Sequence, residues 1–223
     1  MVPPTPFIVK KMRILIYLSR IKKRGDPMAK NLEIEYKNIL SQAEYEELFN
    51  HYNFAKTAPL TQENIYFDTA DGELRKRHIG LRVRITDTYV HLTMKQPVKD
   101  HQKLETTEKL TLIDGESIKE SGKLSQGGEV ADFLATIDIA LDDLIIIGRF
   151  KTVRHQQVVE GQDMVLDHCF FQEYEDYELE VETNNPETGI IFYQNLLQKF
   201  QIPQRPIKQK IVRMNQSKAD YLG

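Results

Sequence analysis

Alternating apolar and polar residues dominate the chain and predict β-strands. In residues 31–40, NLEIEYKNIL, the apolar Leu32, Ile34 and Tyr36 occupy every second position. A period of two is that of a strand with one buried face and one polar face. The same alternation recurs in residues 64–74, 80–97, 103–113 and 145–182. The turns that divide these segments fall at Asp71-Gly72, at Asp87 and at Gly161. We therefore expect roughly eight mostly antiparallel strands.

Three stretches depart from this alternation and predict helices. Ser41 followed by Glu44 is a capping box, in which each side chain accepts a backbone N–H at the start of a helix, so a helix follows the first strand directly. Residues 114–142 have apolar residues at helical spacing and predict one or two helices that cross the sheet. Asn185-Pro186 supplies a cap and a first-turn residue for a helix over 187–200. Strands and helices together indicate one α+β domain.

The charged residues of each predicted strand share one face, because side chains two positions apart lie on the same side. Acids lead the first strand and dominate the last, whereas the middle strands carry bases. The residues concerned are Glu33, Glu35, Lys37, Arg82, Arg84, Lys95, Arg154, Glu178, Glu180 and Glu182. If helices cover the apolar sides, a curved sheet gathers the charged sides inside a tunnel. The alternatives are an open sheet with a solvated charged face and a sheet that binds another protein.

Separate clusters of carboxylates and bases in one concave site suit a particular kind of ligand. Oxygen ligands favour a hard divalent cation, and Arg and Lys favour an anion. Polyphosphate together with magnesium fits both halves of this description.

The composition of the chain excludes other classes of function. Its 223 residues, 40% of them hydrophobic, suit one domain with a core. A formal charge of -3 gives no general attraction to nucleic acid, so we expect no nucleic-acid partner. Cys169 is the single cysteine, which excludes an intrachain disulfide and a multi-cysteine zinc site and favours the cytoplasm.

Residues 1–27 differ from the rest of the chain. They contain seven Lys or Arg and one acid, and their longest apolar run, ILIYL, is too short to span a bilayer. Met28 begins the segment MAKNLEIEYK, so a start at Met28 explains the extension better than a surface anchor does. We expect this basic extension to lie outside the fold, which then occupies residues 28–223 as a single domain without a membrane span.

The order of several short motifs resembles a known family. EIEYK, with Glu33, Glu35 and Lys37, is similar to the E-x-E-x-K signature of the CYTH superfamily, the triphosphate tunnel metalloenzymes. The motifs that follow in the family's order are YFDT (66–69), LRVR (81–84), TMK (93–95), LETTE (104–108), a basic strand around Arg154 and ELEVE (178–182). This resemblance covers residues 31–213. It implies an eight-stranded antiparallel β-barrel tunnel with a charged interior and helices packed outside.

The resemblance also implies roles for individual residues, carried over position by position. The implied metal ligands, for Mg²⁺ or Mn²⁺, are Glu33, Glu35, Glu105, Glu178 and Glu180. The implied phosphate-binding bases are Lys37, Arg82, Arg84, Lys95, Arg154, Lys208 and Lys210. The implied catalytic acids, which hold metal or position water, are Glu35, Glu178 and Glu180. For Lys208, Lys210 and Arg213, a solvated helix end is an equal alternative.

Two places depart from the family's pattern. Thr152 stands where the family often has Lys, two residues before Arg154, and Lys151 has the opposite parity unless the strand bulges. Glu105 and Glu108 are three positions apart, so only one of them points inward. We expect the inward residue to be Glu105.

We therefore expect a divalent-metal-dependent hydrolase that releases orthophosphate from inorganic triphosphate or a simple organic triphosphate. Its partner would be a triphosphate-containing small molecule. A class IV-type adenylate cyclase and a non-catalytic polyphosphate or nucleotide sensor stay open as alternatives, as does a homodimer. The chain contains no P-loop, dinucleotide-binding or nucleophile-elbow motif, and its six histidines have no metal-ligand spacing.

Overall fold

The computed structural model describes residues 28–99, 102–124 and 128–214, and within them the chain forms eight strands. The strands are β1 (Met28–Leu40), β2 (Leu60–Thr69), β3 (Gly80–Ile85), β4 (Val90–Lys99), β5 (Gln102–Leu110), β6 (Leu144–Val159), β7 (Gln162–Phe170) and β8 (Glu175–Thr183). The α-helices are α2 (Gln42–His51), α3 (Glu73–Lys76), α4 (Leu112–Ser121), α5 (Glu129–Ala135), α6 (Pro186–Lys199) and α7 (Lys210–Met214). Two 3-10 turns complete the description, η1 (Phe54–Lys56) and η2 (Leu141–Asp143).

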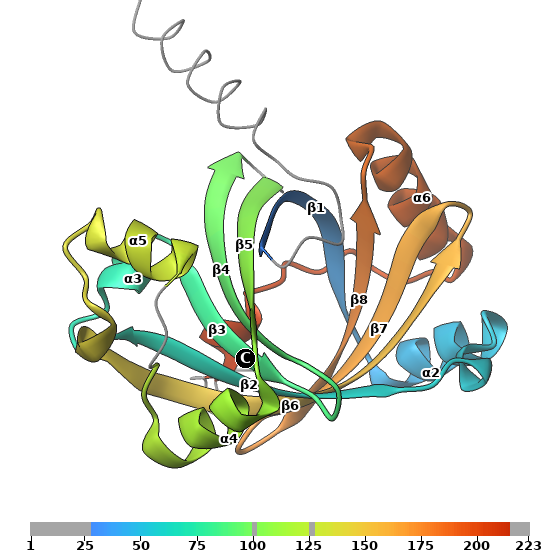
Figure 1. Cartoon of the computed structure of the whole chain (residues 1–223). Coiled ribbons are helices and arrows are strands. Elements are labelled where there is room, and N and C mark those ends of the chain that lie inside the picture. Colours follow the sequence, from blue (N-terminus) through green and yellow to red (C-terminus); the bar gives the residue numbers. More distant parts are fainter. Residues whose placement is uncertain (1–27, 100–101, 125–127, 215–223) are drawn as a thin grey trace, which may run out of the picture.

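The eight strands form a closed antiparallel barrel in the order β1-β5-β4-β3-β2-β6-β7-β8. β1 closes it, because its residues 28–34 pair with β5 and its residues 34–40 pair with β8. Figure 1 shows β1 bending from β5 across to β8. This confirms the predicted antiparallel barrel with helices packed outside it.

Two apolar clusters lie between the barrel and its helices. One packs the outer faces of β2, β3 and β4, including Leu81 and Val83, against α4 and α5. The other packs the outer faces of β1, β7 and β8 against α2 and α6, with Leu48 and Leu196 among its members. Figure 1 shows the two groups of helices on opposite sides of the barrel. Burying each such side chain stabilises the fold by about 1.5–3 kcal/mol, so the charged faces are left to point inward.

The two helix caps predicted from the sequence are confirmed, and one strand ends earlier than predicted. Ser41 and Glu44 form the capping box of α2, and the Asn185 side chain caps α6. A third capping box, between Thr111 and Asp114, starts α4 at Leu112. The predicted strand over 103–113 therefore ends at Leu110, because paired cap hydrogen bonds outweigh the continuing alternation.

Two acids of the family-like motifs fix helices on the outside of the barrel. Glu108 Oε1 accepts a hydrogen bond of 2.7 Å from Val130 N in the first turn of α5. Asp68 accepts from Leu74 N at 2.8 Å and from Arg75 N at 3.1 Å in α3. Such bonds satisfy helix N–H groups that have no partner within the helix. These two carboxylates are therefore structural.

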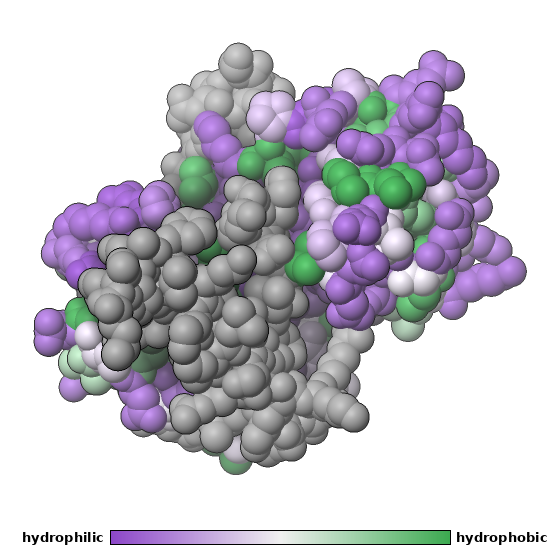
Figure 2. Space-filling view, turned by 90° about the horizontal axis from the view of Figure 1, so that it is seen from above, coloured by the Kyte–Doolittle hydropathy of each residue, from purple (hydrophilic) through white to green (hydrophobic). Residues whose placement is uncertain are grey.

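The outer surface of the described residues is mostly hydrophilic on the face drawn in Figure 2, with hydrophobic side chains in small patches. Among the helices that the structure describes, none has both the length and the apolar character that crossing a membrane requires. The predicted basic extension, residues 1–27, lies outside the described residues.

Candidate functional site

A charged cavity of about 780 Å³ occupies the barrel interior. Its lining comes from seven strands and from the C-terminal segment, defined here as residues 204–211. Among the described residues it contains nine basic side chains, Lys37, Arg82, Arg84, Lys95, Lys103, Arg154, Arg205, Lys208 and Lys210. It contains five carboxylates, Glu35, Glu105, Glu178, Glu180 and Glu182. The charged faces therefore converge on one enclosed site, and the open-sheet alternative is wrong.

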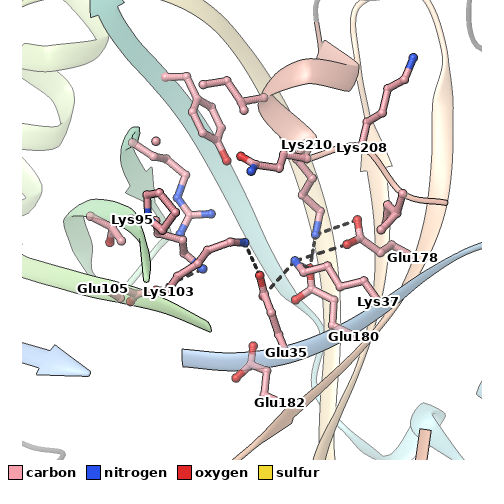
Figure 3. A pocket seen from close by; sticks show the side chains of 18 of the residues that line it. Glu35, Lys37, Lys95, Lys103, Glu105, Glu178, Glu180, Glu182, Lys208 and Lys210 are labelled. Atoms are coloured by element: carbon pink, nitrogen blue, oxygen red, sulfur yellow. Dashed lines mark hydrogen bonds and ion pairs between the residues drawn. The ribbon is translucent and has the colours of Figure 1, made fainter. Parts of the chain in front are cut away.

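Glu35 on β1 is the acid at the centre of this site. Its side chain is 4% exposed, and its two oxygens lie 2.5 Å from Lys103 Nζ and 3.0 Å from Lys37 Nζ. Figure 3 shows both lysines at the Glu35 carboxylate, Lys37 from the same strand and Lys103 from the neighbouring β5. Burial alone would raise the pKa of Glu35, but Lys37 and Lys95 outweigh burial and hold the pKa below its ordinary value. Glu35 is therefore ionised at neutral pH.

The predicted Glu33 has its backbone opposite Lys103 in the pairing of β1 with β5. Its side chain lies outside the described part of the structure, so its implied role stays a prediction.

The acids of β8 lie deep in the cavity and are paired with several cations. Glu180 lies 2.7 Å from Lys37, 2.6 Å from Lys210 and 2.7 Å from Arg154. Burial opposes its ionisation, but these cations hold the pKa of Glu180 well below the ordinary value. Glu178 lies 3.1 Å from the Lys210 ammonium. The structure thus brings the predicted late acids together with the predicted bases.

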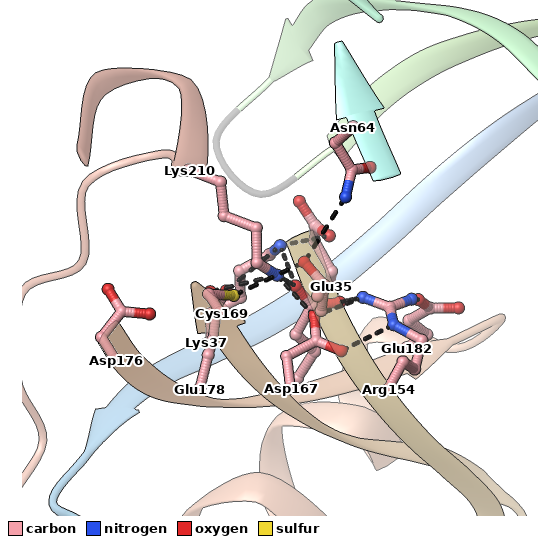
Figure 4. A network of polar contacts seen from close by, with 12 residues as sticks. Glu35, Lys37, Asn64, Arg154, Asp167, Cys169, Asp176, Glu178, Glu182 and Lys210 are labelled. Atoms are coloured by element: carbon pink, nitrogen blue, oxygen red, sulfur yellow. Dashed lines mark hydrogen bonds and ion pairs between the residues drawn. The ribbon is translucent and has the colours of Figure 1, made fainter. Parts of the chain in front are cut away.

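Asp167 on β7 is a buried member of the site that the sequence analysis did not assign. It has no exposed surface and accepts two hydrogen bonds from Arg154, at 2.8 and 2.7 Å. Lys210 Nζ lies 2.6 Å from Asp167 Oδ2. Figure 4 shows Lys210, Arg154 and Asp167 in one network of polar contacts. Burial would raise the pKa of Asp167, but Arg154 and Lys210 lower it to about 2. Its position two residues before the buried Cys169 is the signal that could have placed it on the inner face.

Arg82 and Arg84 form the least compensated part of the cavity. Neither makes an ion pair with a carboxylate of the described residues. Arg84 donates to Asn64 Oδ1 at 3.3 Å, and the buried Nε of Arg82 has no hydrogen-bond partner. Burial, with Arg82 and Arg154 as neighbouring cations, lowers the pKa of Arg84 to about 10. Half-buried guanidinium groups that form no ion pair with a described carboxylate indicate a binding site for an anion.

The two glutamates of β5 separate as expected. Glu105 lines the cavity, where its carboxylate lies 3.2 Å from Lys95 Nζ, and Glu108 caps α5 outside the barrel. Burial would raise the pKa of Glu105, but Lys95 and Arg82 lower it to about 2. The implied metal-binding role of Glu105 stays a prediction.

The C-terminal basic residues are mostly buried in the site. Lys210 contacts Asp167, Glu178 and Glu180, and its side chain is 10% exposed. Arg213 is 1% exposed and pairs with Asp176 and Glu178. The alternative of a solvated helix end is therefore wrong for these two residues, whereas the exposed Lys208 lines the cavity.

Other residues complete the lining of the cavity. Thr152 is buried near Asn64 and Lys151 is exposed, so Arg154 is the inward base of this part of β6. His78 and His91 also line the cavity, which the scattered spacing of the histidines did not indicate. Lys103 is a further base that the sequence analysis missed, because it precedes the motif LETTE.

The carboxylates suit a divalent cation only together with another ligand. Within the described ranges, no three His, Cys, Asp or Glu side chains are grouped so as to hold a metal ion by themselves. Glu35, Glu178 and Glu180 are hard oxygen donors, and each already contacts a lysine. Mg²⁺ is commonly held by one or two carboxylates together with phosphate oxygens. The donor set therefore fits a cation that enters with a phosphate ligand.

Comparisons with known proteins agree with this geometry. The presumed triphosphatase YjbK of Bacillus subtilis (strain 168) is 34% identical over 194 residues, which are 86% of this chain and 98% of YjbK. A presumed adenylate cyclase from Bacillus halodurans superposes with a TM-score of 0.78 at 31% identity, over 84% of this chain and 99% of that one. HpAC1 from Hippeastrum, described as having a dominant triphosphatase activity, gives a TM-score of 0.68 at 23% identity, over 82% and 94%. The CYTH domain matches residues 31–214, and the chain belongs to the CYTH domain family.

Proposed function

We propose that this protein is a divalent-metal-dependent triphosphatase that releases orthophosphate from inorganic triphosphate or a simple organic triphosphate. The observation that carries the proposal is the excess of bases in an enclosed cavity, nine against five carboxylates. Arg82 and Arg84 lack a carboxylate partner among the described residues, and the phosphate oxygens of a polyanion would supply the missing negative charge. The name of YjbK, a relative at 34% identity, supports the same reaction. Action in the cytoplasm and without nucleic acid is part of this proposal.

Hydrolysis of a triphosphate needs positioning and neutralisation of charge more than covalent chemistry. Arg82, Arg84 and Lys95 bind the phosphate chain and offset the charge that grows on the terminal phosphoryl group and on the bridging oxygen. A bound Mg²⁺ or Mn²⁺ supplies Lewis-acid polarisation of the phosphate oxygens.

The acids have a complementary task. Glu35 with Glu178 and Glu180 would hold the cation, and a carboxylate of β8 would orient the attacking water. Lys37 contacts Glu35 and Arg154 contacts Glu180, so these two bases fix the orientation of the carboxylates. In this arrangement no side chain forms a covalent intermediate.

The test is phosphate release by the Glu35→Ala variant. We expect at least a roughly 100-fold loss of Mg²⁺- or Mn²⁺-dependent release, because a residue that acts in the transition state is removed. Substrates for the panel are inorganic triphosphate, thiamine triphosphate, ATP and long-chain polyphosphate, each with magnesium, manganese or calcium. The exposed Glu187 on α6, changed to Ala, is the control with unchanged release. Unchanged release by a correctly folded Glu35→Ala protein would contradict the proposal.

The same panel is to be run on a protein that starts at Met28. We expect turnover equal to that of the full-length chain, because the described cavity is lined by residues from Glu35 onward. A loss of activity would mean that residues 1–27 take part.

An adenylate cyclase is the second candidate, since the B. halodurans protein at 31% identity carries that name. The same bases would bind the phosphates of ATP while its ribose hydroxyl attacks. Formation of cyclic AMP and pyrophosphate from ATP, in place of orthophosphate, would decide for the cyclase. Tight binding of triphosphate without turnover would decide for a non-catalytic sensor.

A further inference from the structure

Lys103 on β5 is a cavity base that contacts Glu35, one of the proposed metal ligands. Its Nζ lies 2.5 Å from Oε1 of Glu35, whose other oxygen is taken by Lys37. Its own side chain is 24% exposed, so it reaches the cavity from a position open to solvent. Figure 3 shows Lys103 lying between Glu35 and the side of the cavity that carries Lys95 and Glu105.

The contact of Lys103 with Glu35 uses an oxygen that the proposed metal site needs. An ammonium and a divalent cation repel each other, so a cation on Oε1 of Glu35 disfavours the Lys103 ammonium at the same oxygen. A cation that binds to Oε1 of Glu35 therefore displaces Lys103. Without the cation, the same lysine lowers the cost of burying the Glu35 charge.

The displaced ammonium has a new position within reach inside the same cavity. Lysine carries its charge on a flexible stem with three donors. Glu105, two residues along on the same face, is already held by Lys95, so it offers the freed ammonium little. The phosphate oxygens of a polyanion bound by Arg82 and Lys95 would offer the freed ammonium new acceptors in this part of the cavity.

We propose that Lys103 is a positioning and phosphate-binding residue that alternates between two partners. In the metal-free protein it balances Glu35, and when the cation and the triphosphate enter it moves to the phosphate chain. This inference rests on the proposed function and adds a residue to it. It couples the two ligands, because the base that leaves the metal site strengthens the site for the anion.

The test is the Lys103→Met variant, studied by binding without turnover. Mn²⁺ titrated into the free protein should bind about 3- to 10-fold more tightly than to the wild type, because its competitor is gone. With saturating Mn²⁺ present, a non-hydrolysable analogue of inorganic triphosphate should bind about 3- to 10-fold more weakly, because the phosphate contact that Lys103 makes in the metal-loaded site is lost. A merely structural role of Lys103 would not tighten the binding of a metal. Lys103→Gln, which keeps a polar side chain, is the second variant and should give the same two shifts with the same signs.

Two control variants separate the local effect from a general change of charge. Lys119→Met removes a lysine whose partners Glu63 and Glu116 lie outside the cavity lining, and both affinities should stay unchanged. Lys208→Met removes a cavity base without a carboxylate partner among the described residues, so it should weaken triphosphate and leave Mn²⁺ unchanged.

Unchanged or weaker Mn²⁺ binding in both Lys103 variants would overturn the inference. Its failure is distinguishable from failure of the proposed function. If the wild type hydrolyses triphosphate while the Lys103 variants keep wild-type affinities, only the role of Lys103 is wrong. If the wild type binds both ligands without turnover while the two affinities of the variants shift in opposite directions, the inference holds and the triphosphatase proposal fails.

Discussion

Single residues in the barrel interior differ in how far their charge is compensated. Asp167 and Glu180 are each surrounded by two or more cations, so their negative charge stabilises the fold. Arg84 has the opposite surroundings, since burial and repulsion from Arg82 and Arg154 lower its pKa to about 10. Residues that are poorly compensated in the free protein are the ones with most to gain from a bound anion.

Arg84→Met therefore has opposite effects on stability and on binding. The lowered pKa of Arg84 means that folding disfavours its charge, so removal of the charge should raise the midpoint of thermal unfolding. A gain of about 1 kcal/mol corresponds to roughly 2–4 °C for a domain of this size. Affinity for inorganic triphosphate should fall by a factor of about 10–100, measured by calorimetry. A variant that is less stable than the wild type and binds as well would contradict this account.

The helices of the barrel are placed by acids that resemble site residues in sequence. Glu108 belongs to the motif LETTE but lies outside the barrel, where Val130 N donates to it. Gly128 precedes α5, and an added Cβ there would meet the Glu108 carboxylate. The outer half of this motif thus fixes α5, and its inner half faces the cavity.

Glu108→Ala and Glu105→Gln form a matched pair that tests this division. Glu108→Ala leaves a buried N–H without an acceptor, which should lower the free energy of unfolding by about 1–3 kcal/mol and leave KM for triphosphate unchanged. Glu105→Gln should reduce metal-dependent phosphate release with a smaller effect on stability. Chemical denaturation and steady-state kinetics on both proteins check it. The reverse pattern would assign the two glutamates to the wrong faces.

At this scale the sequence predicted strands well and boundaries less well. Alternation is visible because one face of the strand packs on helices while the other faces the cavity. In β3, Leu81 and Val83 pack outside the barrel and alternate with Arg82 and Arg84, which line the cavity. The start of α4 was misplaced because Thr111 and Asp114 form a local cap inside an alternating stretch. Asp167 was missed because its neighbours on the same face, Val165 and Cys169, are apolar, so this face lacks the run of charges that marked the other inner faces.

The ionised carboxylates of the barrel interior stabilise the folded protein as a whole, because their pKa values are lower in the folded state than in the unfolded chain. Glu105 and Asp167 have a pKa of about 2 in the folded protein, and the pKa values of Glu35 and Glu180 are also lowered. Ordinary values are 4.5 for Glu and 3.8 for Asp, so on acidification the unfolded chain takes up protons first. The stabilisation is complete above the ordinary values and is lost as the pH falls through the folded ones.

We therefore expect the thermal midpoint to stay nearly constant from about pH 7 to 5 and to fall steadily from about pH 4.5 to 2. Scanning calorimetry across this range checks it. Because the pairs are largely buried, about 0.5 M salt should leave most of the fall in place. A midpoint that is independent of pH down to about 3 would mean that these carboxylates are not paired in solution.

The convergence of the charged faces was predictable from alternation, whereas the C-terminal bases were predicted only through the family resemblance. The family-like order of the motifs predicted which strand faces point inward, and the cavity lining contains eleven of the predicted residues, Glu35, Lys37, Arg82, Arg84, Lys95, Glu105, Arg154, Glu178, Glu180, Lys208 and Lys210. Their roles in binding and catalysis stay predictions. Segment 204–211 carries no periodic pattern, so the pattern alone left a solvated helix end as an equal alternative, and the contacts of Lys210 with Asp167 and Glu180 decide between the two.

The pairing of β1 with β8 has a consequence for how this protein folds during its synthesis. Lys37 and Glu180 meet across it although they are 143 positions apart. While the ribosome is still adding residues, β1 has no second neighbour and the edges of the growing sheet are open. Closure waits until β8 has emerged, and the last ammonium and guanidinium groups of the interior arrive later still. The charged faces of the nascent strands are therefore exposed to water for most of synthesis. Their charge keeps these faces soluble until the barrel closes.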